Sequence, residues 1–332
     1  MKNFPSKQLL LRPGVWAGVV LVAAVAVLPN VLSPSLATVF VLLGLSVTVT
    51  SGVALLMGYA NTISLGHAAF FGVGAYCAAL LAKHGVSPLL SLLASPFAAA
   101  LCAAIVGLPL LRLRGHHLTF ATLAFQVVLL SWVSSQDWLG GEIGIQDVPG
   151  LGVGAWKVSG AGYAYLAWGI AIAVLLLIRN IIGSRPGRAL RTVGASEQAA
   201  AAVGVSVAAL KLKVFILSAA VGGVAGGIYA FYIGYVAPAS FPVLSSVEYV
   251  AMAVVGGLGA AWGPLVGAAT VTTLVQVLNN VATQPGLPAS APAIFSDAVY
   301  GGVIVLILLF LPHGVFPEIQ RLGKLGRARQ NG

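Results

Sequence analysis

The strongest constraint on this chain is the recurrence of long apolar runs. One of them, TVFVLLGLSVTVTSGVALLMGYA at residues 38–60, contains no charged residue. About 20 apolar residues in a helix are enough to cross the roughly 30 Å hydrocarbon core of a bilayer. Only 7% of the 332 residues are charged, which is too few to cover a water-exposed surface. The runs are continuous and do not alternate, so the sequence predicts an all-α, polytopic integral membrane helical bundle and not a barrel.

We expect about eight full spans and one short broken or re-entrant helix pair. The full spans are predicted at residues 14–32, 35–57, 67–83, 87–111, 117–136, 162–182, 212–236 and 297–312, and the pair at 246–258 and 262–282. Together they form a single transmembrane domain, 1–332, with a first span in 1–37, a cytoplasmic segment at 184–213 and a basic tail at 313–332. The first 37 residues also resemble a signal peptide, and we interpret them as an uncleaved span.

The positions of Lys and Arg predict the orientation. If the N-terminus is cytoplasmic, all 17 basic residues except Lys83 and Lys157 lie on the cytoplasmic side, and so does the C-terminus. This clustering accounts for the net charge of +10 without nucleic acid as a partner. Cys77 and Cys102 both lie in apolar runs, so we interpret them as packing residues and not as a disulfide.

Two polar or glycine-rich stretches are candidates for a translocation pathway. In NTISLGHAAF, the residues Asn61, Thr62, Ser64 and His67 bring polar atoms to a glycine-flanked helix start, where free N–H groups can face a wet cavity or a carboxylate. In VVGGLGAAWGP, the glycines Gly256, Gly257 and Gly259 precede Pro264 and interrupt a helix. The alternatives are a capped helix that packs on a neighbour and a packing kink with no part in transport.

The cytoplasmic segment 184–213 is predicted to hold a short helix. Glu197 to Val203 favour helix, Ser196 is a good N-cap and Gly204 provides the stop. The helix is small and apolar, with a rim of basic residues that includes Arg188. Such a helix suits a socket on another protein, or it is an interfacial connector whose arginines meet anionic lipid headgroups.

The chain lacks the motifs of an enzyme. It has no G-x-x-x-x-G-K-[ST] phosphate loop, no H-E-x-x-H and no Cys-pair metal pattern, so we expect no catalytic residues, no metal site and no cofactor. ATP hydrolysis, if the function needs it, is expected on a separate subunit.

Five segments, in chain order, resemble the branched-chain amino acid ABC transporter permease family of the LivM type. The stretch QAAAAVG at 198–204 has the spacing of the EAA-x3-G loop by which ABC importer permeases dock on their ATPase subunits, and it lies in a longer similar run at 187–230. Gln198 takes the place of the acidic residue of that loop, with Glu197 beside it. The other similar segments are GYANTISLGHAAFFGVGAYCAALL, LRLRGHHLTFATLAF, VVGGLGAAWGPLVGA and YGGVIVLILLFLPHGVF.

The resemblance implies a permease subunit of an ATP-driven importer for branched-chain or related hydrophobic amino acids in the inner (plasma) membrane. Its partners would be a second related permease, two ATP-binding subunits, a periplasmic or tethered substrate-binding protein, and membrane lipids. The residues that would couple to the ATPase are Arg188, Glu197, Gln198, Ala199, Ala200 and Gly204. Alternatives are an ABC permease for urea, amides or aromatic acids, an ion-coupled secondary transporter, or a membrane-embedded enzyme.

Overall fold

The structure, a computed structural model, describes residues 25–113, 115–153, 156–282 and 301–302. The basic tail at 313–332 lies outside these residues, and so does most of the predicted spans at 14–32 and 297–312. The predicted count of about eight spans is therefore not confirmed.

The described chain is almost entirely helical. A short helical stretch at 25–31 precedes the first labelled helix. The helices are α3 (Pro34–Ala60), α4 (His67–Lys83), α5 (Pro88–Leu110), α6 (His116–Ser134), α7 (Gly160–Gly183), α8 (Arg185–Ala195), α9 (Glu197–Ala202), α10 (Val207–Ile233), α11 (Val243–Gly256) and α12 (Gly263–Ala282). The minor elements are the 3-10 turns η1 (Asp137–Leu139) and η2 (Pro238–Ser240) and a two-residue antiparallel pair, β1 (Gly152–Val153) with β2 (Trp156–Lys157).

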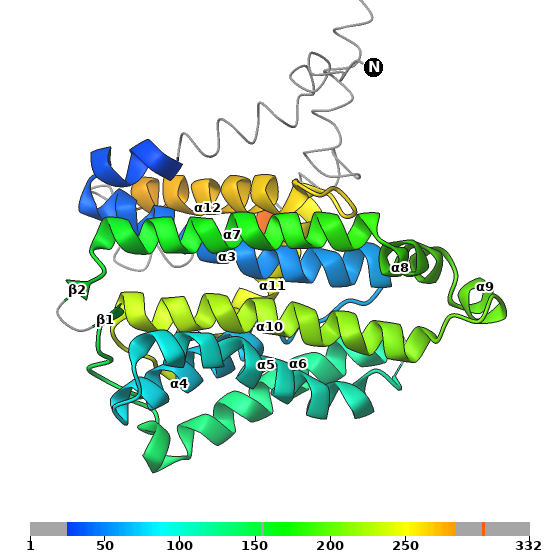
Figure 1. Ribbon diagram of the computed structural model, residues 1–332, viewed down its shortest axis with the longest axis horizontal. Helices are drawn as coiled ribbons and strands as arrows, with labels where there is room; N and C mark the ends of the chain where they lie inside the picture. The colour runs from blue at the N-terminus through cyan, green and yellow to red at the C-terminus, as the bar shows by residue number, and fades with distance from the viewer. Residues whose placement is uncertain (1–24, 114, 154–155, 283–300, 303–332) are drawn as a thin grey trace, which may run out of the picture.

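The long helices lie side by side as a bundle (Figure 1). Among the described residues, six segments are long and apolar enough to cross a membrane: α3, α5, α6, α7, α10 and the stretch Pro238–Gly256 that contains α11. α4 and the Gly263–Val277 part of α12 are shorter apolar helices. This supports a multi-pass membrane bundle. The small hairpin β1–β2 lies at one end of it, and the helices α8 and α9 lie at the other.

The break predicted in the late glycine-rich segment is confirmed. α11 ends at Gly256 and α12 begins at Gly263, and Gly257 has a φ of 102°, which favours glycine. The two helices pack on each other and on α3. The turn between them lies at the α8–α9 end of the bundle, where the Tyr59 hydroxyl donates a 2.6 Å hydrogen bond to the Gly259 carbonyl. The break is therefore a turn at the end of a helical hairpin.

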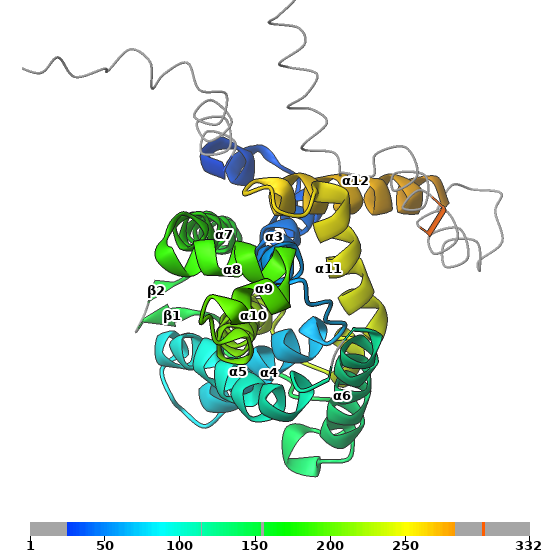
Figure 2. The same ribbon diagram turned by 90° about the vertical axis from the view of Figure 1, so that its right-hand side faces the viewer.

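α10 is the central helix, and glycine lets its neighbours approach at backbone distance. A Cβ atom at Gly226 would collide with the Phe71 carbonyl of α4, and one at Gly223 would meet Ala99 and Ser95 of α5. Small residues permit this kind of approach between helices in lipid, where van der Waals packing drives association. Figure 2, which views the bundle from the α8–α9 end, places α10 among α4, α5 and α3.

This packing predicts that a bulky side chain on the α4-facing side of α10 destabilises the bundle. Gly226→Leu should lower the free energy of unfolding by about 3 kcal/mol, the upper end of the usual overpacking cost, because the obstacle is backbone and cannot rotate away. The measurement is the thermal unfolding midpoint of the purified protein in detergent. Gly169→Leu on α7 is the matched control, since a Cβ there meets no atom of the described residues within 4 Å. Equal midpoints for the two variants would contradict the prediction.

Candidate coupling and transport site

The short helix α9 forms where the sequence predicts it. The Ser196 hydroxyl caps it by accepting a 3.2 Å hydrogen bond from the Ala199 N–H. Gly204 follows with a φ of 81°, so it adopts the left-handed conformation that ends a helix at low cost. Its N–H donates to the Ala201 carbonyl at 3.0 Å.

α9 and the turn after it present a small exposed surface that the rest of the described chain does not cover. Glu197, Gln198, Ala199 and Gly204 are all exposed, as predicted for docking residues, and Val203 is 73% exposed although it is apolar. Ala200 differs from them: it is completely buried, so it packs α9 against the rest of the protein.

Basic residues gather at this end of the bundle. Arg188 lies exposed on the adjacent helix α8. At the opposite end, the described basic residues are Lys83 and Lys157, near the loop that carries Asp137, Glu142 and Asp147.

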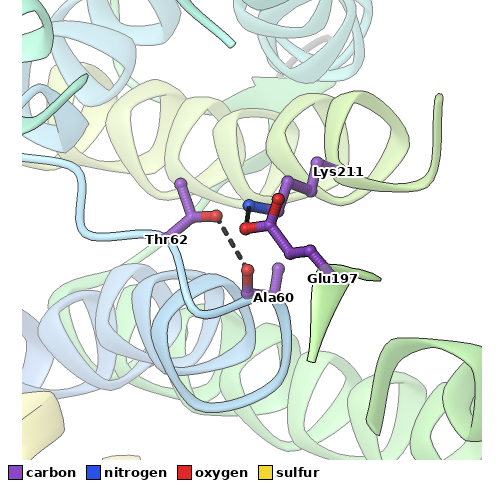
Figure 3. Close-up of polar contacts among 4 residues, drawn as sticks. All are labelled: Ala60, Thr62, Glu197 and Lys211. Atoms are coloured by element: carbon purple, nitrogen blue, oxygen red, sulfur yellow. Dashed lines mark hydrogen bonds and ion pairs between the residues drawn. The ribbon is translucent and has the colours of Figure 1, made fainter. Parts of the chain in front are cut away.

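A cavity of about 1050 Å³, with both apolar and polar side chains in its wall, opens beside α9. It lies between the loop after α3, the end of α5, the start of α6, α9 and the first turns of α10. Its lining includes Asn61, Thr62, Arg112, His116, Glu197, Gln198 and Lys211. Asn61 and Thr62, predicted for the translocation pathway, therefore line the same cavity as Glu197 and Gln198, predicted for coupling to the ATPase. Figure 3 shows Thr62 near the ion pair formed by Glu197 and Lys211.

The loop after α3 is held by its own backbone and by α6. Asn61 ends α3 in the left-handed conformation, with a φ of 47°, and the Thr62 hydroxyl donates to the Ala60 carbonyl at 2.9 Å. From α6, the Thr119 hydroxyl donates to the Ile63 carbonyl at 3.3 Å. The loop is therefore a defined part of the cavity wall.

The start of α4 is closed to ligands in this conformation. His67 is 1% exposed, and its Nε2 shares a 2.7 Å hydrogen bond with the Ser218 hydroxyl of α10. The Ala68 N–H donates to the Ser246 hydroxyl of α11 at 2.9 Å, so it is not free for a substrate. Ser64 is also 1% exposed, and its hydroxyl has no hydrogen-bond partner within the described part of the chain.

A buried polar network behind this helix start was missed by the sequence analysis. The Gln126 amide of α6 donates to the carbonyls of Phe241 and Pro242, and it accepts a 2.6 Å hydrogen bond from the Ser246 hydroxyl. Gln126 is completely buried. A glutamine inside the apolar run TLAFQVVLL was the signal that could have found it, because a polar side chain in lipid needs a partner.

Gly256, Gly257 and Gly259 do not line the cavity. They belong to the turn of the α11–α12 hairpin, where a Cβ at Gly256 would collide with the Gly263 carbonyl. Close packing therefore accounts for Gly256, whereas the left-handed φ of 86° accounts for Gly259.

Among the described residues, no group of three or more His, Cys, Asp or Glu side chains could hold a metal ion.

Comparison with known proteins decides the family. The family described as "Branched-chain amino acid transport system / permease component" matches residues 35–308, most of the chain. The chain belongs to this family. Family membership and the apolar helices together make it a multi-pass membrane protein and a permease component of an ABC transporter.

Curated relatives agree with this assignment. The chain is 26% identical to the high-affinity branched-chain amino acid transport system permease protein LivM of Escherichia coli over 90% of its own length and 72% of that protein. It is 27% identical to LivM of Salmonella typhimurium over 89% and 71%. A nucleoside ABC transporter permease protein, NupC of Lactococcus lactis, is 26% identical over 70% and 76%. No solved structure was found to match the chain.

The buried network yields a stability prediction. Gln126→Leu should cost about 1–3 kcal/mol of unfolding free energy, because it leaves the Phe241 and Pro242 carbonyls and the Ser246 hydroxyl without their partner. Thermal unfolding in detergent measures this. Gln146→Leu is the control, since Gln146 is exposed and makes only a local hydrogen bond to Ile143. An unchanged midpoint in the Gln126 variant would show that the network contributes nothing.

Proposed function

We propose that this chain is the permease subunit of an ATP-driven ABC importer for branched-chain or related hydrophobic amino acids. The observation that carries the proposal is α9, a capped, exposed, small-residue helix at the basic end of the bundle. Family membership supports the reading of α9 as the helix that docks on an ATPase subunit. Exposed apolar surface on a protruding helix outside the membrane indicates a protein partner.

The transport cycle follows from this docking. ATP binding closes a pair of ATPase subunits, which displaces α9, and the attached helices tilt to exchange outward for inward access. The cycle has a direction only if the cargo interacts differently with the two states. Gln198 and Ala199 would contact the ATPase, Glu197 would couple α9 to the bundle, Arg188 would lie at the rim and Gly204 would form the bend. Asn61 and Thr62 would line the cytoplasmic end of the pathway, while Ser64, His67 and the turn at Gly256, Gly257 and Gly259 would shape it.

The proposed assembly contains a second related permease, two ATP-binding subunits and a periplasmic or tethered binding protein, in the inner (plasma) membrane. Both termini would be cytoplasmic. Support comes from the distribution of charge, because Lys and Arg concentrate at the α8–α9 end of the described chain.

A nucleoside is the second candidate cargo, because one relative is a nucleoside ABC transporter permease. Urea, amides and aromatic acids are weaker candidates, and an ion-coupled secondary transporter is weaker still. Uptake of radiolabelled leucine and of uridine into vesicles with the reconstituted complex separates the first two. Leucine uptake that needs ATP supports the proposal; uptake of uridine alone, or uptake without the ATPase subunits, overturns it.

Docking on α9 is tested by a bulky substitution. Ala199→Trp should greatly reduce co-purification of the ATPase subunits. Ala199 is exposed on a surface of small residues, so the indole ring would protrude from it and block close contact with the partner. Insertion and the unfolding midpoint should not change. Gln146→Trp is the control, since it places the same side chain on the exposed loop at the opposite end. Normal recovery of the complex with the Ala199 variant would exclude α9 as the docking helix.

A further inference from the structure

One ion pair is found within the described part of the chain, and it joins α9 to α10. The Lys211 ammonium lies 2.6 Å from the Glu197 carboxylate. The Lys211 side chain is only 13% exposed and that of Glu197 is 43% exposed, so the pair is partly shielded from water. Shielded pairs interact more strongly than surface pairs, because solvent and salt screen them less.

α9 has little else to connect it to the membrane helices. Ala200 is its only buried residue, and the helix packs mainly on α8, with few contacts to α10. The cavity of about 1050 Å³ lies along the side that Glu197, Gln198 and Ala201 face. The link from α9 to α10 is the short turn 203–206, which bends at Gly204. The ion pair is therefore a direct side-chain link from α9 to α10, beside an indirect route through α8, which packs on α3 and α7.

The face of α10 that carries Lys211 continues into the bundle. Ser218 lies seven residues further, which is two helical turns, so both side chains are on the same face. Ser218 bonds His67 at the start of α4, and a Cβ at Gly52 of α3 would meet the Ser218 hydroxyl at 2.9 Å. A displacement of the first turns of α10 would thus reach the loop 61–66 that walls the cavity.

We propose that Lys211 is a positioning residue that transmits the displacement of α9 to α10 through its ion pair with Glu197. The proposal rests on the docking of an ATPase subunit on α9. In this mechanism the ion pair stays formed throughout the cycle and acts as a rigid connection, here called the strut. It does not bind the ATPase. It sets how far α10 moves when α9 moves. Lys211→Met should therefore leave assembly intact and uncouple ATP hydrolysis from transport.

The experiment uses the full complex in proteoliposomes and measures leucine transported per ATP hydrolysed. Lys211→Met should lower this ratio by about five-fold or more, the lower range of typical coupling between sites. Lys211→Arg, which keeps the charge, should retain the wild-type ratio. Lys213→Met is the matched control, because Lys213 is exposed two residues further on the same helix and forms no ion pair with any residue that the structure describes. It should behave as the wild type.

Recovery of the ATPase subunits distinguishes this inference from the proposed function. If the wild-type complex does not assemble or does not couple ATP to leucine uptake, both are overturned. If it does, and Lys211→Met has the wild-type ratio, the inference alone fails. Loss of ATPase recovery in Lys211→Met would also overturn it, since the pair would then build the docking surface and transmit nothing.

Substitution of Glu197, alone and together with Lys211, tests the same ion pair. Glu197→Gln should lower the amount of leucine transported per ATP hydrolysed, as Lys211→Met does. It therefore tests the same ion pair if the Lys211 variant is poorly folded. The variant with both changes should be no worse than Lys211→Met, because residues that act through one contact are not additive. An additive loss would mean that the two residues act separately and would overturn the strut.

Discussion

The close approach of α10 to α4 and α5 is the interaction on which the rest of the structure depends. In lipid there is no hydrophobic force between helices, so their association relies on packing and interhelical hydrogen bonds. Gly222 and Gly226 face α4, while Gly223 and Gly227 face α5. Because α10 is held on two sides at backbone distance, it is a rigid central element, and a shift at the end nearest α9 would displace its neighbours.

The regions proposed for docking and for transport meet at that end of α10. α9 is exposed, capped and weakly packed, whereas the start of α4 is buried and hydrogen-bonded to α10, α6 and α11. The cavity lies between these two regions. In the proposed mechanism, the loosely held α9 moves at low cost, and the tightly held start of α4 moves only as a unit with its neighbours.

Local features were predictable from the sequence because they depend on neighbouring residues. The Ser196 cap, the stop at Gly204 and the break after Gly256 each follow from residue types with a known backbone preference. The roles of Gln126, Ser246 and Lys211 were not predicted. Each of them acts through a partner on a different helix, and a single sequence does not say which faces of two helices meet.

The sequence by itself determined the class of this protein: long apolar runs with few charges can only form a membrane bundle, and the positions of Lys and Arg indicate its orientation. The tertiary structure decided which distant segments share a site. It brought Asn61 and Thr62 to the wall occupied by Glu197, and it placed the glycine turn at Gly256 elsewhere. The physical reason is that continuous apolar runs and residues with a known backbone preference fix where a helix lies along the chain, whereas side-chain packing fixes how it is rotated against its neighbours.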